Sequence, residues 1–244
     1  MSPLALAAAA HAALAAGMGI GRFAFTPILP LMQAEGALTL AGGGSLAAAN
    51  YAGYLAGALS APLVTRSLGA RAGLVGVALL TLAMGFDQGL ASWIALRAAA
   101  GVASAWVLVH VSAWSLERLA RSPALGGVLY AGVGAGAALA GGVCLAVLHL
   151  DLAARAAWIA LGLVALGLSA ALWPVFTDQK KTGAPAVRHR WTRDSLTLVW
   201  CYAAFGFGYI IPATFISAMA REASPDPAIY GASWPAFGLS LIHI

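Results

Sequence analysis

The chain has 244 residues, of which 61% are hydrophobic and 9% are charged. A soluble domain has about 45–50% apolar and about 25% charged residues, so this composition excludes an ordinary soluble protein. It predicts an all-α integral membrane protein, because a helix satisfies its own backbone hydrogen bonds within lipid. The net charge of +5 would suit a nucleic-acid partner. The basic residues argue against that class, since they lie mostly in loops between apolar stretches.

Seven apolar stretches are long enough to cross a hydrocarbon core of about 30 Å, which takes about 20 helical residues. No basic segment precedes the first, so we expect it to remain in the protein rather than to be cleaved as a signal peptide. An eighth stretch begins near Tyr230 and ends with the chain in GLSLIHI, so a truncated reading frame is expected. The seven predicted spans are 4–30, 44–65, 71–87, 90–114, 125–149, 154–176 and 195–219.

Nine basic residues fall in alternate loops, whereas the opposite loops hold only Arg155 and Arg221. The positive-inside rule places the nine, and the N-terminus with them, in the cytoplasm. We therefore expect a multi-pass protein of the bacterial plasma (inner) membrane. The nine residues are Arg66, Arg71, Arg118, Arg121, Lys180, Lys181, Arg188, Arg190 and Arg193.

The first span contains GMGIGRFAFTPILP, in which Arg22 interrupts an apolar run. Its glycines permit close approach of a neighbouring helix, or they form a gating hinge. Its prolines are expected to loosen the outer end of the helix. These residues are Gly17, Gly19, Gly21, Pro27 and Pro30.

Further polar side chains lie inside the predicted spans. Asn50 can orient a ligand or an arginine, because a buried amide needs partners, and Tyr51 and Tyr54 could share its face. A purely structural role is the alternative for all three. His11 and His110 have side chains that titrate near neutral pH, so each is a proton relay or a merely hydrogen-bonded histidine.

The longest polar stretch, 177–194, separates six spans from the rest of the chain. We interpret it as a cytoplasmic linker between a six-helix half at 1–176 and the start of a second half at 195–244. A short internal repeat supports this division: both halves read G-x-G, then a large polar-tipped residue, then a proline. The matching residues are Gly19, Gly21, Arg22 and Pro27 in the first span and Gly206, Gly208, Tyr209 and Pro212 in the seventh.

Three segments resemble motifs of the major facilitator superfamily. WIALRAAAGVASAWV is similar to motif B, in which an arginine, here Arg97, is followed four positions later by a glycine, here Gly101. GVGAGAALAGG at 132–142 resembles motif C without its proline, and its glycines are expected to pack helices. RSLGAR at 66–71 stands in the place of motif A without its aspartate, which removes the usual gating salt bridge of that loop.

The segments GIGRFAFTPILPLMQ, NYAGYLAGAL and FGFGYIIPATF resemble the YbfB/YjiJ-type branch of this superfamily. The resemblance implies a major-facilitator-type helical bundle and secondary active transport of a small solute by alternating access. It also implies proton coupling, and that the first, fourth and seventh helices line a central cavity. No cofactor and no oligomer are implied.

Arg22 and Arg97 each cost about 2.5–3.5 kcal/mol to insert near mid-span, so each needs a partner. At a rise of about 1.5 Å per residue they lie about 12 and about 11 Å from the outer ends of their helices. The predicted spans contain no Asp or Glu except at their ends, so we predict that an organic anion supplies the missing charge. The alternative is that backbone carbonyls, or side chains such as Asn50 and Tyr54, hold the arginines.

The sequence therefore predicts a substrate site formed by Arg22, Arg97, Asn50, Tyr51, Tyr54 and Tyr209. A seven-helix receptor or sensor is the alternative function, although the predicted N-terminus is inside and no retinal-binding lysine is present in the seventh span. An enzyme is not expected, because the chain shows no paired acids, metal-ligand spacing or nucleophile motif.

Overall fold

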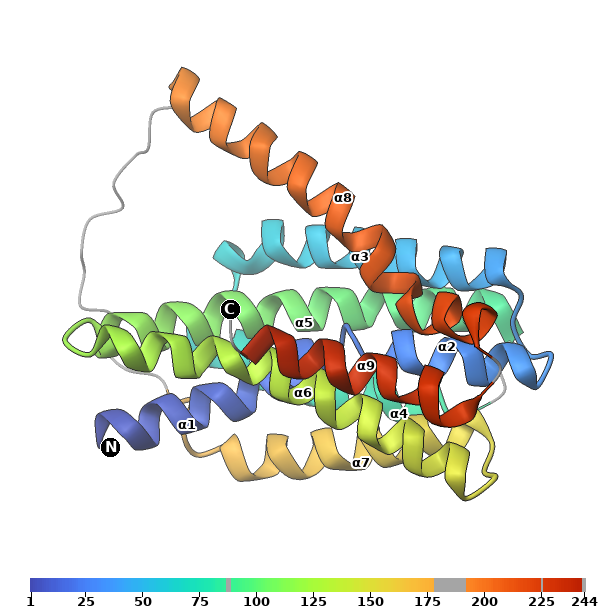
Figure 1. Ribbon diagram of the computed structural model, residues 1–244. Coiled ribbons are helices and arrows are strands. Elements are labelled where there is room, and N and C mark those ends of the chain that lie inside the picture. Colours follow the sequence, from blue (N-terminus) through green and yellow to red (C-terminus); the bar gives the residue numbers. More distant parts are fainter. Residues whose placement is uncertain (87–88, 178–191, 225, 243–244) are drawn as a thin grey trace.

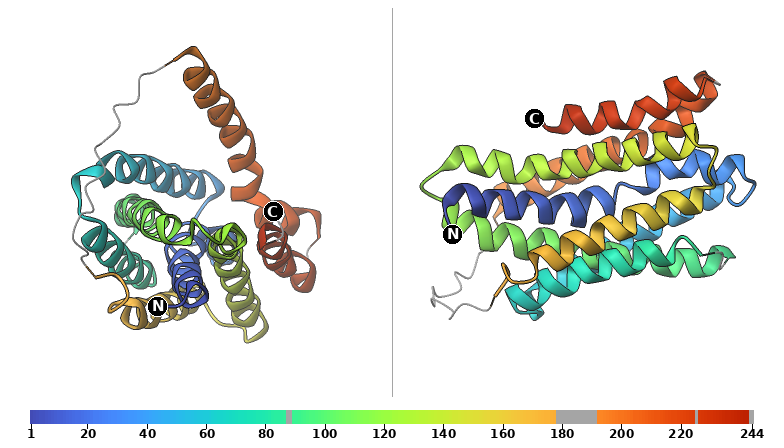
Figure 2. Two further views of the ribbon diagram at one scale, coloured as in Figure 1. Left: turned by 90° about the vertical axis from the view of Figure 1, so that its left-hand side faces the viewer. Right: turned by 90° about the horizontal axis from the view of Figure 1, so that it is seen from below.

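The computed structural model describes residues 1–86, 89–177, 192–224 and 226–242, and these contain helices but no strand, which confirms the all-α fold. Figure 1 shows the helices running side by side, with the amino-terminal half of α8 leaning away from the others. The end-on view in Figure 2 places α8 and α9 on one side of the bundle. The elements are α1 (Pro3–Leu14), η1 (Ala15–Ile20), α2 (Phe25–Ala34), α3 (Leu40–Ser60), η2 (Ala61–Leu63), α4 (Arg66–Ala83), α5 (Gly89–Leu119), α6 (Pro123–His149), α7 (Ala154–Leu172), α8 (Arg193–Ala223) and α9 (Pro227–Ile242).

The predicted spans correspond to these helices in chain order, and the first span comprises α1, η1 and α2. The prediction for the second span needs a correction. Of the described segments, six are long and apolar enough to cross a membrane: Pro3–Ala34 and the helices α4, α5, α6, α7 and α8. The predicted second span, now α3, is not among them, because its glycines, serines and Asn50 lower its hydropathy. It nevertheless lies alongside α5 in the bundle. The predicted linker lies outside the described residues except for its two ends.

Glycines allow α3 and α5 to pack with their backbones in contact. A Cβ atom at Gly53 would lie 1.9 Å from the carbonyl oxygen of Ala98, and one at Gly101 would lie 2.1 Å from the carbonyl oxygen of Asn50. No real side chain fits at such distances, so only glycine permits this approach. The pairing therefore depends on close backbone contact rather than on apolar side chains.

The first membrane segment is broken in the middle. The N–H of Gly21 donates to Ala16 O at 3.0 Å and the N–H of Phe23 donates to Met18 O at 3.1 Å, which are the wider turns of a π-helix. Regular helix resumes at Phe25, just before Pro27, which has no N–H to donate to the preceding turn. We expected the prolines to loosen the outer end, but this was wrong: α2 continues through Pro30, and the irregular turns precede Pro27.

The glycines of this broken segment lie where it passes between α5 and α6. A Cβ atom at Gly17 would lie 2.4 Å from Val107 Cγ1, and one at Gly19 would lie 2.4 Å from Gly136 Cα. A Cβ atom at Gly21 would lie 2.5 Å from Ser104 Oγ. All three positions therefore pack closely against neighbouring helices in this conformation.

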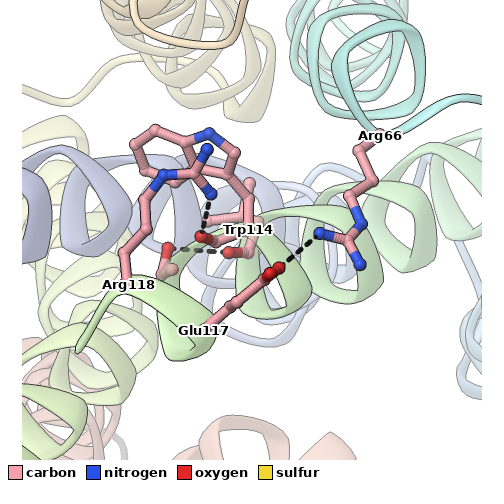
Figure 3. Close-up of polar contacts among 6 residues, drawn as sticks. Arg66, Trp114, Glu117 and Arg118 are labelled. Carbon is pink, nitrogen blue, oxygen red and sulfur yellow. Dashed lines mark hydrogen bonds and ion pairs between the residues drawn. The ribbon is translucent and has the colours of Figure 1, made fainter. Parts of the chain in front are cut away.

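One end of the bundle, which we call the basic end, carries Arg66, Glu117 and Arg118 (Figure 3). Arg66 Nη1 lies 2.8 Å from Glu117 Oε2 and links α4 to α5. Both side chains are more than half exposed, so solvent screens this ion pair and it contributes little to stability. Arg118 donates to the carbonyl oxygen of Trp114 at 2.6 Å, and its guanidinium lies 4.7 Å from the centre of that indole.

The opposite end is joined by polar contacts to helix termini. Glu35, just after α2, accepts a hydrogen bond at 2.5 Å from the N–H of Ala154, the first residue of α7. A carboxylate there also stabilises the positive end of the helix dipole. Arg221, in the last turn of α8, donates to the carbonyl oxygen of Pro30 at 2.7 Å. The two contacts hold the end of α2 to α7 and to α8.

The glycine contacts predict opposite effects at two helical positions. Gly101→Ala should lower the free energy of unfolding by about 1–3 kcal/mol, because the new methyl group collides with the backbone of α3. Gly142→Ala in α6 should raise it by up to about 1 kcal/mol, since nothing lies within 4 Å of a Cβ there and alanine favours helix. Thermal unfolding in detergent measures both. Equal effects at the two positions would contradict the packing described here.

Candidate substrate-binding site

Arg97 in α5 is enclosed by the broken part of the first membrane segment. Its side chain is 2% exposed. Its Nη1 donates to the carbonyl oxygen of Gly21 at 3.2 Å, and its Nη2 donates to the carbonyl oxygen of Arg22 at 3.0 Å. The guanidinium carbon also lies 5.3 Å from the centre of the Phe25 ring. Arg97 therefore closes the gap in backbone hydrogen bonding that the break creates.

Asn50 fixes the same region from α3. Its side chain is completely buried, and its Nδ2 donates to the carbonyl oxygen of Arg97 at 2.9 Å. Asn50 thus orients an arginine, one of the two roles considered for it, but it does so through the main chain. Its Oδ1 has no hydrogen-bond partner among the described residues.

Arg22 has surroundings of a different kind, because aromatic rings cover its guanidinium. The guanidinium carbon lies 4.5 Å from the ring centre of Tyr54, 5.2 Å from that of Tyr51 and 5.3 Å from that of Phe23. Such contacts are worth about 0.5–2 kcal/mol each. Arg22 Nε is buried without a hydrogen-bond partner, and no carboxylate of the described residues pairs with this side chain. The charge is partly stabilised but not neutralised.

Helix α8 approaches this group of rings from the other side. The Tyr51 hydroxyl hydrogen-bonds to the hydroxyl of Thr214, which itself donates to Ile210 O at 2.6 Å. Tyr209, one turn earlier in α8, lies within electrostatic range of Arg22 and stacks on Phe205. Residues of the first membrane segment, α3 and α8 therefore meet around one guanidinium.

A cavity of about 450 Å³ adjoins this group. Phe23 and Tyr209 line it, and Phe23 is also one of the rings that cover Arg22. The described residues that line the cavity carry no charge. The remaining lining residues are Gly126, Gly127, Tyr130, Ala131, Val133 and Gly134 of α6 and Leu241 and Ile242 of α9.

The predicted site residues thus separate into two groups. Arg22, Tyr51 and Tyr54 come together, and Tyr209 lines the adjoining cavity with Phe23. Arg97 faces backbone carbonyls instead of a space shared with Arg22, which is the alternative that the sequence left open.

The matching glycines and proline of α8 do not join the site by contact. Nothing lies within 4 Å of a Cβ atom at Gly206 or Gly208, and Pro212 is exposed. Their role in gating or packing stays a prediction.

The two histidines contact other parts of the bundle. His11 Nδ1 lies 2.8 Å from the carbonyl oxygen of Val128 and joins α1 to α6. His110 is 4% exposed and packs on Gly69 of α4, where a Cβ atom would lie 2.0 Å from its ring. Its Nε2 has no hydrogen-bond partner among the described residues. A proton relay through either histidine stays a prediction.

Three aromatic residues near the candidate site were not predicted from the sequence. Phe23 follows Arg22 directly, and Trp234 of α9 packs against it with ring centres 6.2 Å apart. Tyr130 lines the cavity from α6. Two of these residues could have been predicted from the sequence. Phe23 is next to the charged Arg22, and Tyr130 is a lone tyrosine in a glycine-rich helix. Trp234 could not have been predicted, because only the docking of α9 brings it there.

The chain matches one family model over residues 14–243. That family is described as "Uncharacterised MFS-type transporter YbfB". No curated protein and no solved structure matches the chain.

The role of Arg97 predicts a loss of stability on substitution. Arg97→Met should lower the free energy of unfolding by about 1–3 kcal/mol for each carbonyl left without a donor. Arg97→Lys should recover only part of the loss, because an ammonium group lacks the planar fork that reaches two carbonyls. Thermal unfolding in detergent provides the measurement, with the exposed Arg155→Met as the matched control. Similar midpoints for the Arg97 and Arg155 variants would show that the carbonyls do not need Arg97.

Proposed function

Because the chain belongs to the YbfB family of major-facilitator-type transporters, we propose that it carries a small organic anion and that Arg22 binds this anion. The family makes the chain a multi-pass membrane transporter of a small-molecule solute. The anion, the binding residue and the mechanism are the parts that we propose.

The observation that carries the proposal is the unneutralised charge of Arg22. Its guanidinium is held by three rings, its Nε lacks a hydrogen-bond partner, and no described carboxylate reaches it. A guanidinium binds carboxylate through two parallel hydrogen bonds, so an anionic solute supplies both the charge and the acceptors. The adjoining cavity gives such a solute space beside Phe23 and Tyr209.

We propose alternating access between two halves, 1–176 and the part that begins at 195, joined by the linker at 177–194. In support, the site takes residues from both sides of this division. The hydrogen bond between Tyr51 and Thr214 connects α3 of the first half to α8 of the second. A rocking motion of the halves would break this bond and open the space around Arg22.

We place the N-terminus and the basic end in the cytoplasm of a bacterial cell, at its inner membrane. Arginine and tryptophan lie together at this end, as is typical of a cytoplasmic membrane interface. Besides Arg118 on Trp114, Arg71 donates to Trp173 O at 3.0 Å, with its guanidinium 4.8 Å from the indole centre. Proton coupling is proposed from the family resemblance alone.

Transport by the protein in proteoliposomes tests the role of Arg22. Arg22→Gln keeps a polar group but shortens the side chain and removes its charge, so anion uptake should fall about 10- to 100-fold as about 1.5–3 kcal/mol of charged hydrogen bonding is lost. Arg155→Gln removes an exposed charge outside the site and should transport like the wild type. Normal uptake of organic anions by a folded Arg22→Gln protein would rule out this site.

A further inference from the structure

We infer that the solute is an aromatic monocarboxylate, a planar ring that bears a single carboxylate. This inference rests on the proposed function, since it takes Arg22 as the binding residue. It follows from three features of the site: the charge that is available, the donor atom that lacks a partner, and the chemistry of the cavity wall.

The available charge corresponds to one anionic group. Of the two arginines inside the bundle, Arg97 has both Nη atoms on backbone carbonyls and is 2% exposed. Both arginines keep an Nε without a hydrogen-bond partner, but Arg22 is partly exposed whereas Arg97 is enclosed, and the described residues lining the cavity add no charge. A second negative charge on the solute would lose its hydration without gaining a partner, which is strongly unfavourable in an apolar interior. A dicarboxylate or a phosphate is therefore disfavoured.

The rings around Arg22 determine which of its atoms meet the carboxylate. Phe23, Tyr51 and Tyr54 surround the guanidinium, and apart from the Tyr54 hydroxyl, which hydrogen-bonds to Arg22, their ring faces offer no lone pair to an N–H group. Nε is buried without a hydrogen-bond partner, which is unfavourable. A carboxylate that binds side-on to Nε and one Nη removes this cost and leaves the ring contacts in place.

The cavity wall favours a flat apolar group behind that carboxylate. Phe23, Tyr130 and Tyr209 contribute aromatic surface. Gly126 and Gly127 add no side chains, and a Cβ atom at Gly127 would meet nothing within 4 Å, so the wall beside α6 is open and smooth. Aromatic rings that pack on one another gain stability beyond the area they bury. A volume of about 450 Å³ lies within the usual range of small-molecule sites, about 300–1,000 Å³.

Binding to the purified protein in detergent tests the inference with five probes. Benzoate and phenylacetate have the proposed chemistry. Cyclohexanecarboxylate keeps the charge and size without the flat ring, benzamide keeps the ring without the charge, and phthalate adds a second carboxylate. Isothermal titration should give benzoate or phenylacetate a Kd at least about fivefold below that of each other probe, as about 1 kcal/mol of ring stacking predicts.

Two variants assign the preference to named side chains. Arg22→Gln should bring benzoate to the affinity of benzamide. Tyr209→Leu should lower the affinity for benzoate to the affinity for cyclohexanecarboxylate. Both carboxylates should still bind better than benzamide. Tyr202→Leu is the matched control, because Tyr202 is on the same helix, is 70% exposed and does not line the cavity. It should bind all five probes like the wild type.

The outcomes separate the inference from the proposed function. If cyclohexanecarboxylate binds as tightly as benzoate and depends on Arg22, the aromatic class is wrong and the anion site stands. If phthalate binds most tightly, the inference that the solute carries a single negative charge is wrong. If no carboxylate shows Arg22-dependent binding, both the inference and the proposed site are wrong. The comparison of probes on the wild-type protein keeps the test decisive even where a variant fails to fold.

Discussion

A backbone carbonyl inside a membrane bundle needs a hydrogen-bond donor. The packing around the candidate site depends on two such carbonyls, those of Gly21 and Arg22. The first membrane segment departs from regular α-helix between Ala15 and Ala24, and the carbonyl oxygens of Gly21 and Arg22 accept hydrogen bonds from Arg97. An unmet carbonyl would cost several kilocalories per mole in this environment. The broken segment is therefore tied to α5, and α5 is tied to α3 through Asn50 at the same residue.

This tie separates the roles of two chemically identical side chains. Both Nη atoms of Arg97 donate to the backbone and its side chain is enclosed, whereas Arg22 is fixed at its main chain and its side chain is partly exposed. Arg97 thus acts as a positioning residue for Arg22. A solute bound at Arg22 would lie one residue from the contacts that hold the helix break, so binding and helix packing are close enough in space to influence each other.

Glycines decide how near the helices come to one another around the site. The close approaches of Gly19 to α6 and of Gly101 to α3 leave no room for side chains, so these contacts have sharp steric limits. Gly206 and Gly208 in α8 have no such neighbours within 4 Å of a Cβ atom, although their spacing repeats that of Gly19 and Gly21. The same short pattern therefore serves tight packing in one helix and leaves open space in the other.

The all-α membrane fold, the approximate helix ends and the presence of two costly arginines follow from the sequence alone, because hydropathy and charge act over a local stretch of chain. The sequence also grouped Tyr51, Tyr54 and Tyr209 with the arginines, and Tyr51 and Tyr54 do lie over Arg22. The packing of distant helices set three further features: the break precedes Pro27, Arg97 caps the backbone, and Trp234 packs on Phe23 beside Arg22. Those outcomes depend on which donor on another helix reaches a freed carbonyl, and a linear pattern of residue types does not contain that distance.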